Sequence, residues 1–323
     1  MISLQESQVF KEKLLQASHV LIVGHRNPDG DALGSVLAIA DFLEENRKVY
    51  KIFCREANLQ NFYFLSGLER IISDPFLISS KKFDVIVFCD CSDLKQASLG
   101  DLAEKIFGNK PFVVNIDHHA TNEKYGNLNI VNEAAASATE VVMDIFKTGN
   151  IKITRDMAIC LLTGILADTG NFLNPSGTAE SMLHGAELLK YGFSFNRVYE
   201  YLNKNKSIDV LKFWGKILSR LIYNQELDMV IALIKKEDIE EFGLDDEACA
   251  GLSNFLNSLC EAGSIMVLRE TEDLRIKGSL RTSREDVDVS KFCSLLGGGG
   301  HKRAAGFSIK GRLEETLEAW RVV

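Results

Sequence analysis

The stretch that decides the fold is residues 20–35, which read VLIVGHRNPDGDALGS. Its first four residues are apolar and end at Gly24, a pattern typical of a buried strand. From Leu33 onward, apolar residues recur at helical spacing. Open α/β sheets bind ligands beyond the carboxyl ends of their strands, so the loop between this strand and helix lies where a site is expected. That loop carries three potential metal ligands, which are His25, Asp29 and Asp31.

The bulk properties are those of an ordinary globular chain. Its 323 residues, 46% hydrophobic and 25% charged, suffice for two domains. No apolar run approaches the roughly 20 residues that cross a bilayer, and residues 1–16 predict an amphipathic helix rather than a signal peptide, so we expect no membrane partner. Seven cysteines without a paired framework favour the reducing cytoplasm. A net charge of −8 argues against binding of long nucleic acid through a basic surface.

Strands and helices alternate through the N-terminal part of the chain. Strands are expected at 49–53, 84–89 and 112–116, and helices at 32–45, 138–147, 155–166 and 179–189, with Ser137 and Glu140 forming a capping-box pattern before the second helix. This alternation predicts an α/β fold with a doubly wound, mostly parallel sheet. We expect this domain to span 1–190, a helical linker to span 191–216 with a break at 203–209, and a smaller α/β domain to span 217–323.

Acidic and imidazole groups recur at the ends of these elements. Asp90 follows the strand at 84–89, the run Asp117-His118-His119 follows the strand at 112–116, and Asp168 lies in GILADTGNF. Each alone has an ordinary interpretation as a turn former, a helix cap or a satisfied histidine, but together they meet at one edge of one sheet. Four carboxylates collect there, from Asp29, Asp31, Asp90 and Asp168.

The charge and chemistry of this cluster predict two divalent metal ions. Two such ions would neutralise four carboxylates that otherwise repel one another. Mixed nitrogen and oxygen ligands favour Mn²⁺ over Mg²⁺, which prefers oxygen and water. Cys89 and Cys91 flank Asp90 without zinc-site spacing, and we interpret them as packing residues.

The C-terminal part predicts a second, smaller domain. Strand-like runs at 218–223 and 229–234 flank a hairpin turn, a helix covers 249–259, and strands follow at 264–268 and 275–281. Four glycines at 297–300 cannot stabilise a helix or strand, so we expect an ordered loop between a helix at 287–295 and a strand at 305–309. Its backbone N–H groups, followed by His301, Lys302 and Arg303, would contact an anion.

These motifs resemble a known family. NPDGDALGS at 27–35, Asp90 after its strand, DHHATN at 117–122 and GILADTGNF at 164–172 are similar to the four motifs of the DHH phosphoesterase superfamily. GGGGHKRAAGF at 297–307 resembles the signature of its associated C-terminal domain, first subfamily. No motif residue is missing. In length and in the absence of further domains, the chain most resembles the nanoRNases of the NrnA type, which are bifunctional oligoribonuclease/pAp phosphatases.

The resemblance implies a role for each motif residue of the first domain. His25 and Asp29 would hold one metal, Asp90 would bridge to the second, and the second would be held by Asp31, His118 and Asp168. Asp117 would orient its neighbours and His119 would lie near the scissile phosphate, so the catalytic set is Asp90, Asp117 and His119. We interpret Gly30 as the residue that lets the chain turn, so that the carboxylates of Asp29 and Asp31 diverge toward different metals.

In the second domain, the resemblance implies that substrate is bound by Gly298, Gly299, Gly300 and His301. Arg281 would be a second phosphate anchor. Lys277 is a weaker candidate, and its alternative is a plain exposed strand residue. The active site would lie in the cleft between the two domains.

The implied function is a Mn²⁺-dependent two-metal hydrolase. It would cut oligoribonucleotides of about 2–5 nucleotides, including pGpG and pApA, to 5′-mononucleotides, and pAp to AMP. The alternatives left open are a cyclic- or linear-dinucleotide phosphodiesterase, an inorganic pyrophosphatase, a RecJ-like exonuclease of single-stranded DNA, and a nucleotide-binding regulator without catalysis. The expected partners are these small nucleotides and not long nucleic acid. A homodimer is a further open alternative.

Overall fold

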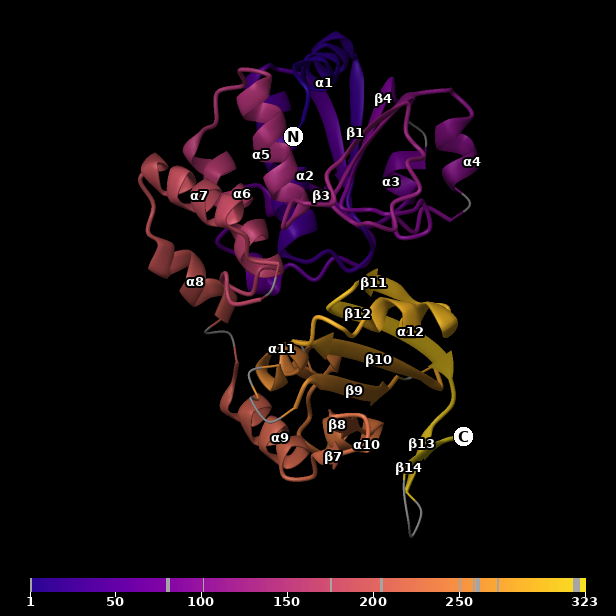
Figure 1. The fold of residues 1–323 in the computed structure, drawn as a ribbon. Helices are drawn as coiled ribbons and strands as arrows, with labels where there is room; N and C mark the ends of the chain where they lie inside the picture. The colour runs from indigo at the N-terminus through magenta and orange to yellow at the C-terminus, as the bar shows by residue number, and fades with distance from the viewer. Residues whose placement is uncertain are drawn as a thin grey trace. The chain divides into compact units, whose positions relative to one another are not determined.

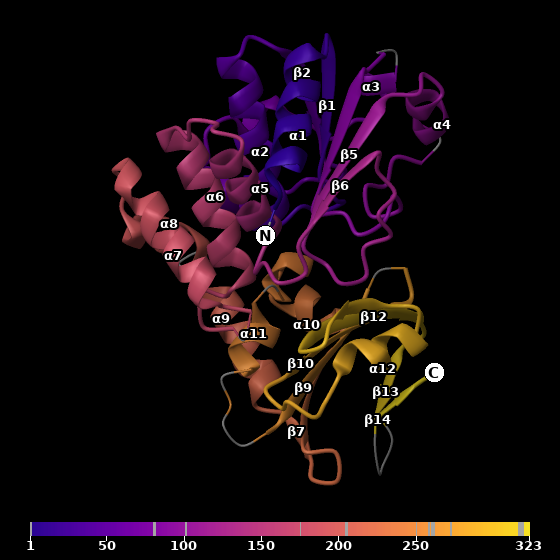
Figure 2. The same cartoon turned by 45° about the horizontal axis from the view of Figure 1, so that its top comes forward.

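The chain folds into two compact units, Met1–Asn205 and Lys206–Val323. The computed structural model describes residues 2–79, 82–100, 102–174, 176–203, 206–249, 251–257, 259, 262–271, 273–315 and 320–323. Figure 1 labels helices and strands of both units where there is room, and Figure 2 labels β2, β5 and β6 of the first unit. Residues 191–216, predicted as a linker, contribute to both units, and residues 204 and 205 of the predicted break lie outside the described residues.

The first unit is built on a parallel six-stranded sheet in the order β3-β2-β1-β4-β5-β6. Its strands are β1 (His19–Val23), β2 (Val49–Phe53), β3 (Ile71–Ile72), β4 (Val85–Cys89), β5 (Phe112–Asp117) and β6 (Leu128–Val131). All neighbouring strands pair in parallel. After β1, the chain adds β2 and then β3 on one side of it. The chain then crosses to the other side of β1 and adds β4, β5 and β6 in turn. This confirms the predicted doubly wound sheet and places the switch of direction between β1 and β4.

Helices cover both faces of this sheet. They are α1 (Leu4–Gln16), α2 (Gly30–Glu45), α3 (Phe76–Ser79), α4 (Leu102–Phe107), α5 (Ala138–Thr148), α6 (Arg155–Asp168), α7 (Ala179–Leu188) and α8 (Phe195–Asn203), with short 3-10 turns η1 (Gln60–Phe62), η2 (Leu68–Arg70) and η3 (Leu189–Tyr191). Val20 and Ile22 pack in the core with α2, α5 and α6, whereas Leu21 and Val23 pack on the opposite side with α3 and α4 (Figures 1 and 2). Because both faces are buried, the strands read as continuous apolar runs.

Two helix ends differ from the prediction in ways that concern the site. Helix α6 continues to Asp168 rather than ending at 166, so that this aspartate is the last residue of the helix. Ser137 caps α5 by accepting the N–H of Glu140, as predicted. The carboxylate of Glu140, however, accepts the N–H of Ala136 and not that of Ser137, so the expected capping box is only half formed.

The second unit has a mixed six-stranded sheet in the order β11-β12-β10-β9-β8-β7 and a separate β13-β14 pair. Its strands are β7 (Ile222–Asn224), β8 (Met229–Ile234), β9 (Ser264–Glu270), β10 (Arg275–Thr282), β11 (Gly299–His301), β12 (Ala304–Lys310), β13 (Leu313–Glu315) and β14 (Trp320–Val322). Its helices are α9 (Ile208–Leu218), α10 (Lys236–Glu241), α11 (Leu252–Leu256) and α12 (Val289–Leu295), with the 3-10 turn η4 (Asp246–Cys249). No described helix of either unit is both long enough and apolar enough to cross a membrane.

The strand predicted at 218–223 is wrong over its first residues. Leu218 is the last residue of α9, and β7 begins only at Ile222. Phe213, Trp214 and Ile217 are buried at helical spacing, and this tertiary packing extends the helix through a segment that looks strand-like by itself.

The glycine loop predicted at 297–300 is also wrong in part. Gly299–His301 form β11, which pairs antiparallel with β12. A side chain at Gly298 would collide with the carbonyl oxygen of Gly306, and Gly300 has a φ of +136°. The glycines therefore serve a close approach of two strands, a use that the single sequence does not reveal.

Candidate metal centre

The predicted site residues of the first unit gather at one edge of the parallel sheet. His25 follows β1, Asp90 follows β4 directly, and Asp117 ends β5, with His118 and His119 after it. β1, β4 and β5 are neighbours in the sheet, so their carboxyl ends lie together. Asp90 adopts a left-handed φ of 56°, a conformation that aspartate tolerates better than most residues and that turns the chain sharply as it leaves β4.

Gly30 brings Asp31 to this edge for a reason other than the one predicted. Gly30 is the first residue of α2 and is not among the residues with positive φ, so its backbone conformation does not itself require glycine. A Cβ at this position would lie 2.7 Å from the Cβ of Ala167. Glycine is therefore required because α2 and α6 approach closely here, and this approach sets Asp31 beside Asp168.

Two groups of ligand atoms form on either side of Asp90. In one, the ligand atoms of His25, Asp29 and Asp90 lie within 4.8 Å of one another, and in the other the same holds for Asp31, His118 and Asp168. Asp90 Oδ2 lies 3.4 Å from His25 Nε2, whereas Asp90 Oδ1 lies 3.7 Å from His118 Nε2. The two oxygens of one carboxylate thus face different groups. The assignment of these residues as metal ligands stays a prediction.

The carboxylate of Asp31 is held by three hydrogen bonds. It is fully buried and accepts hydrogen bonds from the N–H of Ala138 at 2.6 Å, the N–H of Thr139 at 2.8 Å and the hydroxyl of Thr139 at 2.7 Å. These donors belong to the first turn of α5, where the helix dipole also favours an anion. Helix α5 therefore fixes the position and direction of the Asp31 carboxylate.

Burial and neighbouring charges shift the pKa of several groups in this cluster. Burial, followed by the charge of Asp90, raises the pKa of Asp31. Burial, followed by the charge of Asp31, raises the pKa of Asp168. For His25, burial opposes protonation, but hydrogen bonds to Asp29 and Asp90 raise its pKa. Each raised pKa marks a place where a cation would replace a proton.

The histidines are oriented by neighbouring acceptors. His25 Nδ1 lies 2.9 Å from the carbonyl oxygen of Arg26, so that Nε2 faces Asp29 and Asp90. His119 Nδ1 lies 2.8 Å from Asp117 Oδ1, which also accepts the N–H of His118. Burial lowers the pKa of His118, which favours the neutral imidazole that a metal needs. For His119, burial opposes protonation, but the bond to Asp117 raises its pKa to about 9.

The donor set fits a divalent metal centre. Asp90 is 4% exposed, and its Oδ1 accepts no hydrogen bond from any residue that the structure describes. Buried carboxylate oxygens are rarely left in this state, and a cation would supply the missing partner. A cavity of about 290 Å³ opens on the centre, and it is lined by His25, Arg26, Asp29, Asp90, Gln96, His119 and Asp168.

Two residues that line this cavity escaped the sequence analysis. Arg26 adjoins His25, and its guanidinium pairs with Glu56 at 2.6 Å. The sequence signal that could have identified Arg26 is its position directly after the candidate ligand His25. Gln96 comes from a loop with no recognisable motif. The backbone N–H of Arg26 donates to the Gln96 carbonyl oxygen at 2.8 Å, a contact that only the tertiary structure makes visible.

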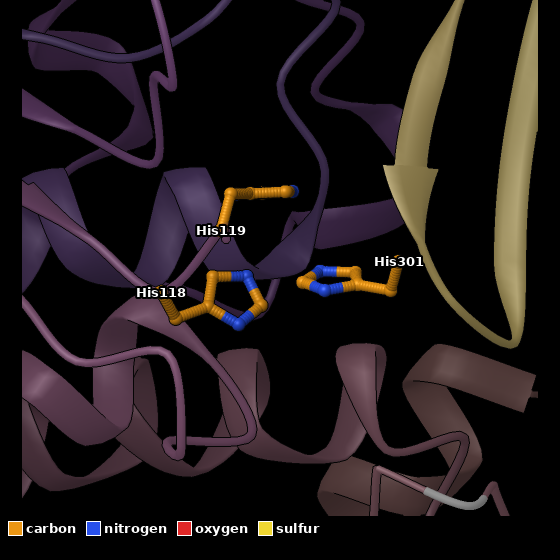
Figure 3. A group of neighbouring side chains, drawn as sticks. All are labelled: His118, His119 and His301. Atoms are coloured by element: carbon orange, nitrogen blue, oxygen red, sulfur yellow. The ribbon is translucent and has the colours of Figure 1, made fainter. Parts of the chain in front are cut away.

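In the second unit, the predicted substrate-binding residues are only partly gathered. Arg281 on β10 and His301 on β11 both lie opposite Ala304 of β12, so they flank the same position from two sides. Gly298, Gly299 and Gly300 lead into His301 along the same hairpin. Lys277 lies four residues earlier on β10, opposite Ser308, and is exposed. Figure 3 labels His118, His119 and His301. The ring centroids of His118 and His119, both in the first unit, are 4.5 Å apart. A site shared by the two units stays a prediction.

Comparison with known proteins defines the class to which this fold and site belong. Residues 19–165 match the DHH family, N-terminal domain, and residues 226–321 match the DHHA1 domain. The chain belongs to the DHH family. It is 30% identical over 308 residues to the bifunctional oligoribonuclease and PAP phosphatase NrnA of Thermus thermophilus, covering 94% of this chain and 89% of the relative.

Further relatives agree with this assignment. The protein of the same name from Bacillus subtilis is 24% identical over 294 residues, covering 90% of this chain and 89% of the relative. Among solved structures, an exopolyphosphatase-related protein from Bacteroides fragilis matches with a TM-score of 0.86 at 24% identity, covering 98% of this chain and 94% of that one. This match shows the same fold.

Proposed function

We propose that the chain is a metal-dependent phosphoesterase that hydrolyses short oligoribonucleotides to 5′-mononucleotides and pAp to AMP. The observation that carries this proposal is the carboxylate of Asp90, whose two oxygens face two separate groups of ligand atoms. Its high burial and the orphaned Oδ1 atom are what a pair of cations would require. The names of the two NrnA relatives supply the substrate class.

The proposed cofactor is a pair of divalent ions, with Mn²⁺ favoured by the mixture of imidazole and carboxylate donors. His25 and Asp29 would hold one ion and Asp31, His118 and Asp168 the other, with Asp90 between them. When bound, such ions lower the pKa of a water molecule and stabilise the charge that develops at phosphorus.

The chain's own residues orient the substrate in this cavity. Asp117 holds His119 through Nδ1 at 2.8 Å and receives the Asn122 amide at 2.6 Å, so the imidazole plane is fixed. We propose that His119, which lines the cavity, donates a hydrogen bond from Nε2 to a phosphate oxygen of the substrate. Asp117 orients the His119 imidazole and stabilises its protonated form. The Asp117 carboxylate itself is fully buried.

Preference for short substrates rests on the second unit. Arg281 and His301 flank one position of its sheet, and we propose that they bind a substrate phosphate other than the one attacked. Two anchors suit substrates of about 2–5 nucleotides, including the linear dinucleotides pGpG and pApA. The net charge of −8 offers no basic path along which a long strand would move.

The test is a substrate panel with Mn²⁺, comparing pAp, pApA, pGpG, cyclic di-AMP, pyrophosphate and a long single strand of DNA. The wild-type protein should cleave the first three, and Asp90→Ala should abolish all cleavage because both ligand groups lose their shared carboxylate. Glu12→Ala, which removes an exposed carboxylate of α1, is the matched control. Retained hydrolysis by Asp90→Ala would refute the proposed chemistry. Equal rates on pApA and the long strand would refute the length preference.

A further inference from the structure

A second buried cluster of charges lies on α5 and α7, outside the metal centre. His184 of α7 is 2% exposed, and its Nδ1 lies 3.4 Å from Glu140 Oε1. Its Nε2 lies 3.3 Å from Asp144 Oδ1 and 3.8 Å from Glu180 Oε1. Asp144 and Glu180 reach solvent, whereas Glu140 is 2% exposed. Within the described part of the chain, His184 is the one basic side chain at ion-pair distance from Glu140.

A buried carboxylate needs such a partner. Burial opposes protonation of His184, but its interactions with Asp144 and Glu140 raise its pKa to about 9. The imidazole is therefore charged at neutral pH and compensates the buried charge of Glu140.

Glu140 in turn connects this cluster to the metal centre. Its Oε2 accepts the N–H of Ala136 at 2.9 Å, which fixes the turn that enters α5. Ser137 closes the same turn by capping the N–H of Glu140 at 3.1 Å. The next two residues, Ala138 and Thr139, donate their N–H groups to Asp31. A continuous series of contacts thus runs from His184 to a proposed metal ligand.

We propose that His184 is a positioning residue for the metal centre, acting through Glu140 on the turn that presents the N–H groups of Ala138 and Thr139 to Asp31. The inference rests on the proposed function, because it takes Asp31 as a metal ligand. Without His184, the buried Glu140 carboxylate would have no cation beside it and would turn toward solvent. The Ala136 N–H would then lose its acceptor, and the first turn of α5 would no longer be fixed under Asp31.

A second ion pair between α5 and α7 makes it possible to distinguish a positioning role of His184 from a role in holding the two helices together. Lys147 at the end of α5 pairs with Glu187 of α7 at 2.6 Å, and both side chains are exposed. This pair also ties α5 to α7, but it lies at the end of α5 away from Asp31. Lys147→Met is therefore a matched control that loosens the helix pair without touching the turn at Ala136.

The experiment titrates the full-length protein with Mn²⁺ by calorimetry, without substrate. His184→Leu should weaken one of the two Mn²⁺ affinities about tenfold, as expected when a partner behind a ligand is removed, and Lys147→Met should leave both unchanged. The double variant His184→Leu/Glu140→Gln should regain most of the lost affinity. Its amide oxygen still accepts the Ala136 N–H, but no buried charge remains to be compensated.

Unchanged Mn²⁺ binding by folded His184→Leu would overturn the inference, and so would a loss that the double variant does not repair. If His184→Leu fails to fold, His184→Gln is titrated in the same way, with the same expected loss. A wild-type protein that binds two Mn²⁺ but hydrolyses no phosphoester would refute the proposed function and leave this inference standing. A wild-type protein that binds no Mn²⁺ would overturn both.

Discussion

Replacement of Gly30 by alanine tests how the metal centre is assembled. The added Cβ would lie 2.7 Å from the Cβ of Ala167 and 3.3 Å from Phe62 Cε1, whereas ordinary contacts begin at 3.4 Å. The difference between 3.4 and 2.7 Å requires α2 and α6 to separate by at least about 0.7 Å at this point. Asp31 and Asp168 directly follow Gly30 and Ala167 in the chain, so the same displacement widens the ligand group that they form with His118.

The expected magnitude follows from the cost of overpacking. Extra atoms in a well-packed interior cost about 1–3 kcal/mol, which corresponds to a loss of about 5- to 150-fold in Mn²⁺ affinity if the strain is relieved by displacing the ligands. Calorimetric titration with Mn²⁺ measures this loss, and thermal unfolding of the metal-free protein measures the strain that remains in the fold.

Two further variants decide the cause. Ala167→Gly removes the methyl group that collides, so Gly30→Ala/Ala167→Gly should recover the affinity that Gly30→Ala loses. Gly215→Ala, in α9 with no atom within 4 Å of the added Cβ, should be neutral or stabilise the protein by up to about 1 kcal/mol. Wild-type affinity in Gly30→Ala would refute the close-approach explanation. A loss that Ala167→Gly fails to repair would show that glycine is needed for the conformation of the chain.

Three further predictions concern pH, metal and substrate. His184 faces Glu140, Asp144 and Glu180, and its pKa of about 9 exceeds the ordinary 6.5, so its contribution to stability is complete below pH 6.5 and is lost as the pH rises through 9. The unfolding free energy of the wild type should fall by at most about 3 kcal/mol between those limits, and His184→Leu should not show this fall. Both tryptophans, Trp214 and Trp320, lie in the second unit. Mn²⁺ at 100 times its Kd should therefore stabilise the circular-dichroism transition of the first unit by about 2.7 kcal/mol for each ion bound, and it should leave the tryptophan-fluorescence transition in place. A joint shift of both transitions would show that the units unfold together. Arg281→Ala should raise KM for oligonucleotides and should leave the hydrolysis of a model phosphodiester with an uncharged tail little affected. An equal loss of kcat/KM on both substrates would show that Arg281 takes part in the hydrolysis itself.

The local elements of the first unit were predictable because each has a strong local cause. β1, β4 and β5 are buried on both faces, so their apolar runs stand out in the sequence. The motif residues follow these runs, and parallel strands bring their carboxyl ends together without further information. The second unit was less predictable, since β11 is held by pairing with β12 and its glycines carry no strand propensity.

The sequence by itself determined the parallel sheet, the edge at which His25, Asp90 and His118 meet, and the family. Tertiary structure alone decided how the carboxylates are held. Asp31 takes its three hydrogen-bond donors from residues more than a hundred positions later, and Gly30 is required by its contact with Ala167. Glu140 departs from the capping-box pattern and faces His184 on another helix. Local patterns arise from neighbours in the chain, whereas these contacts arise from the packing of α2, α5, α6 and α7, which no local pattern encodes.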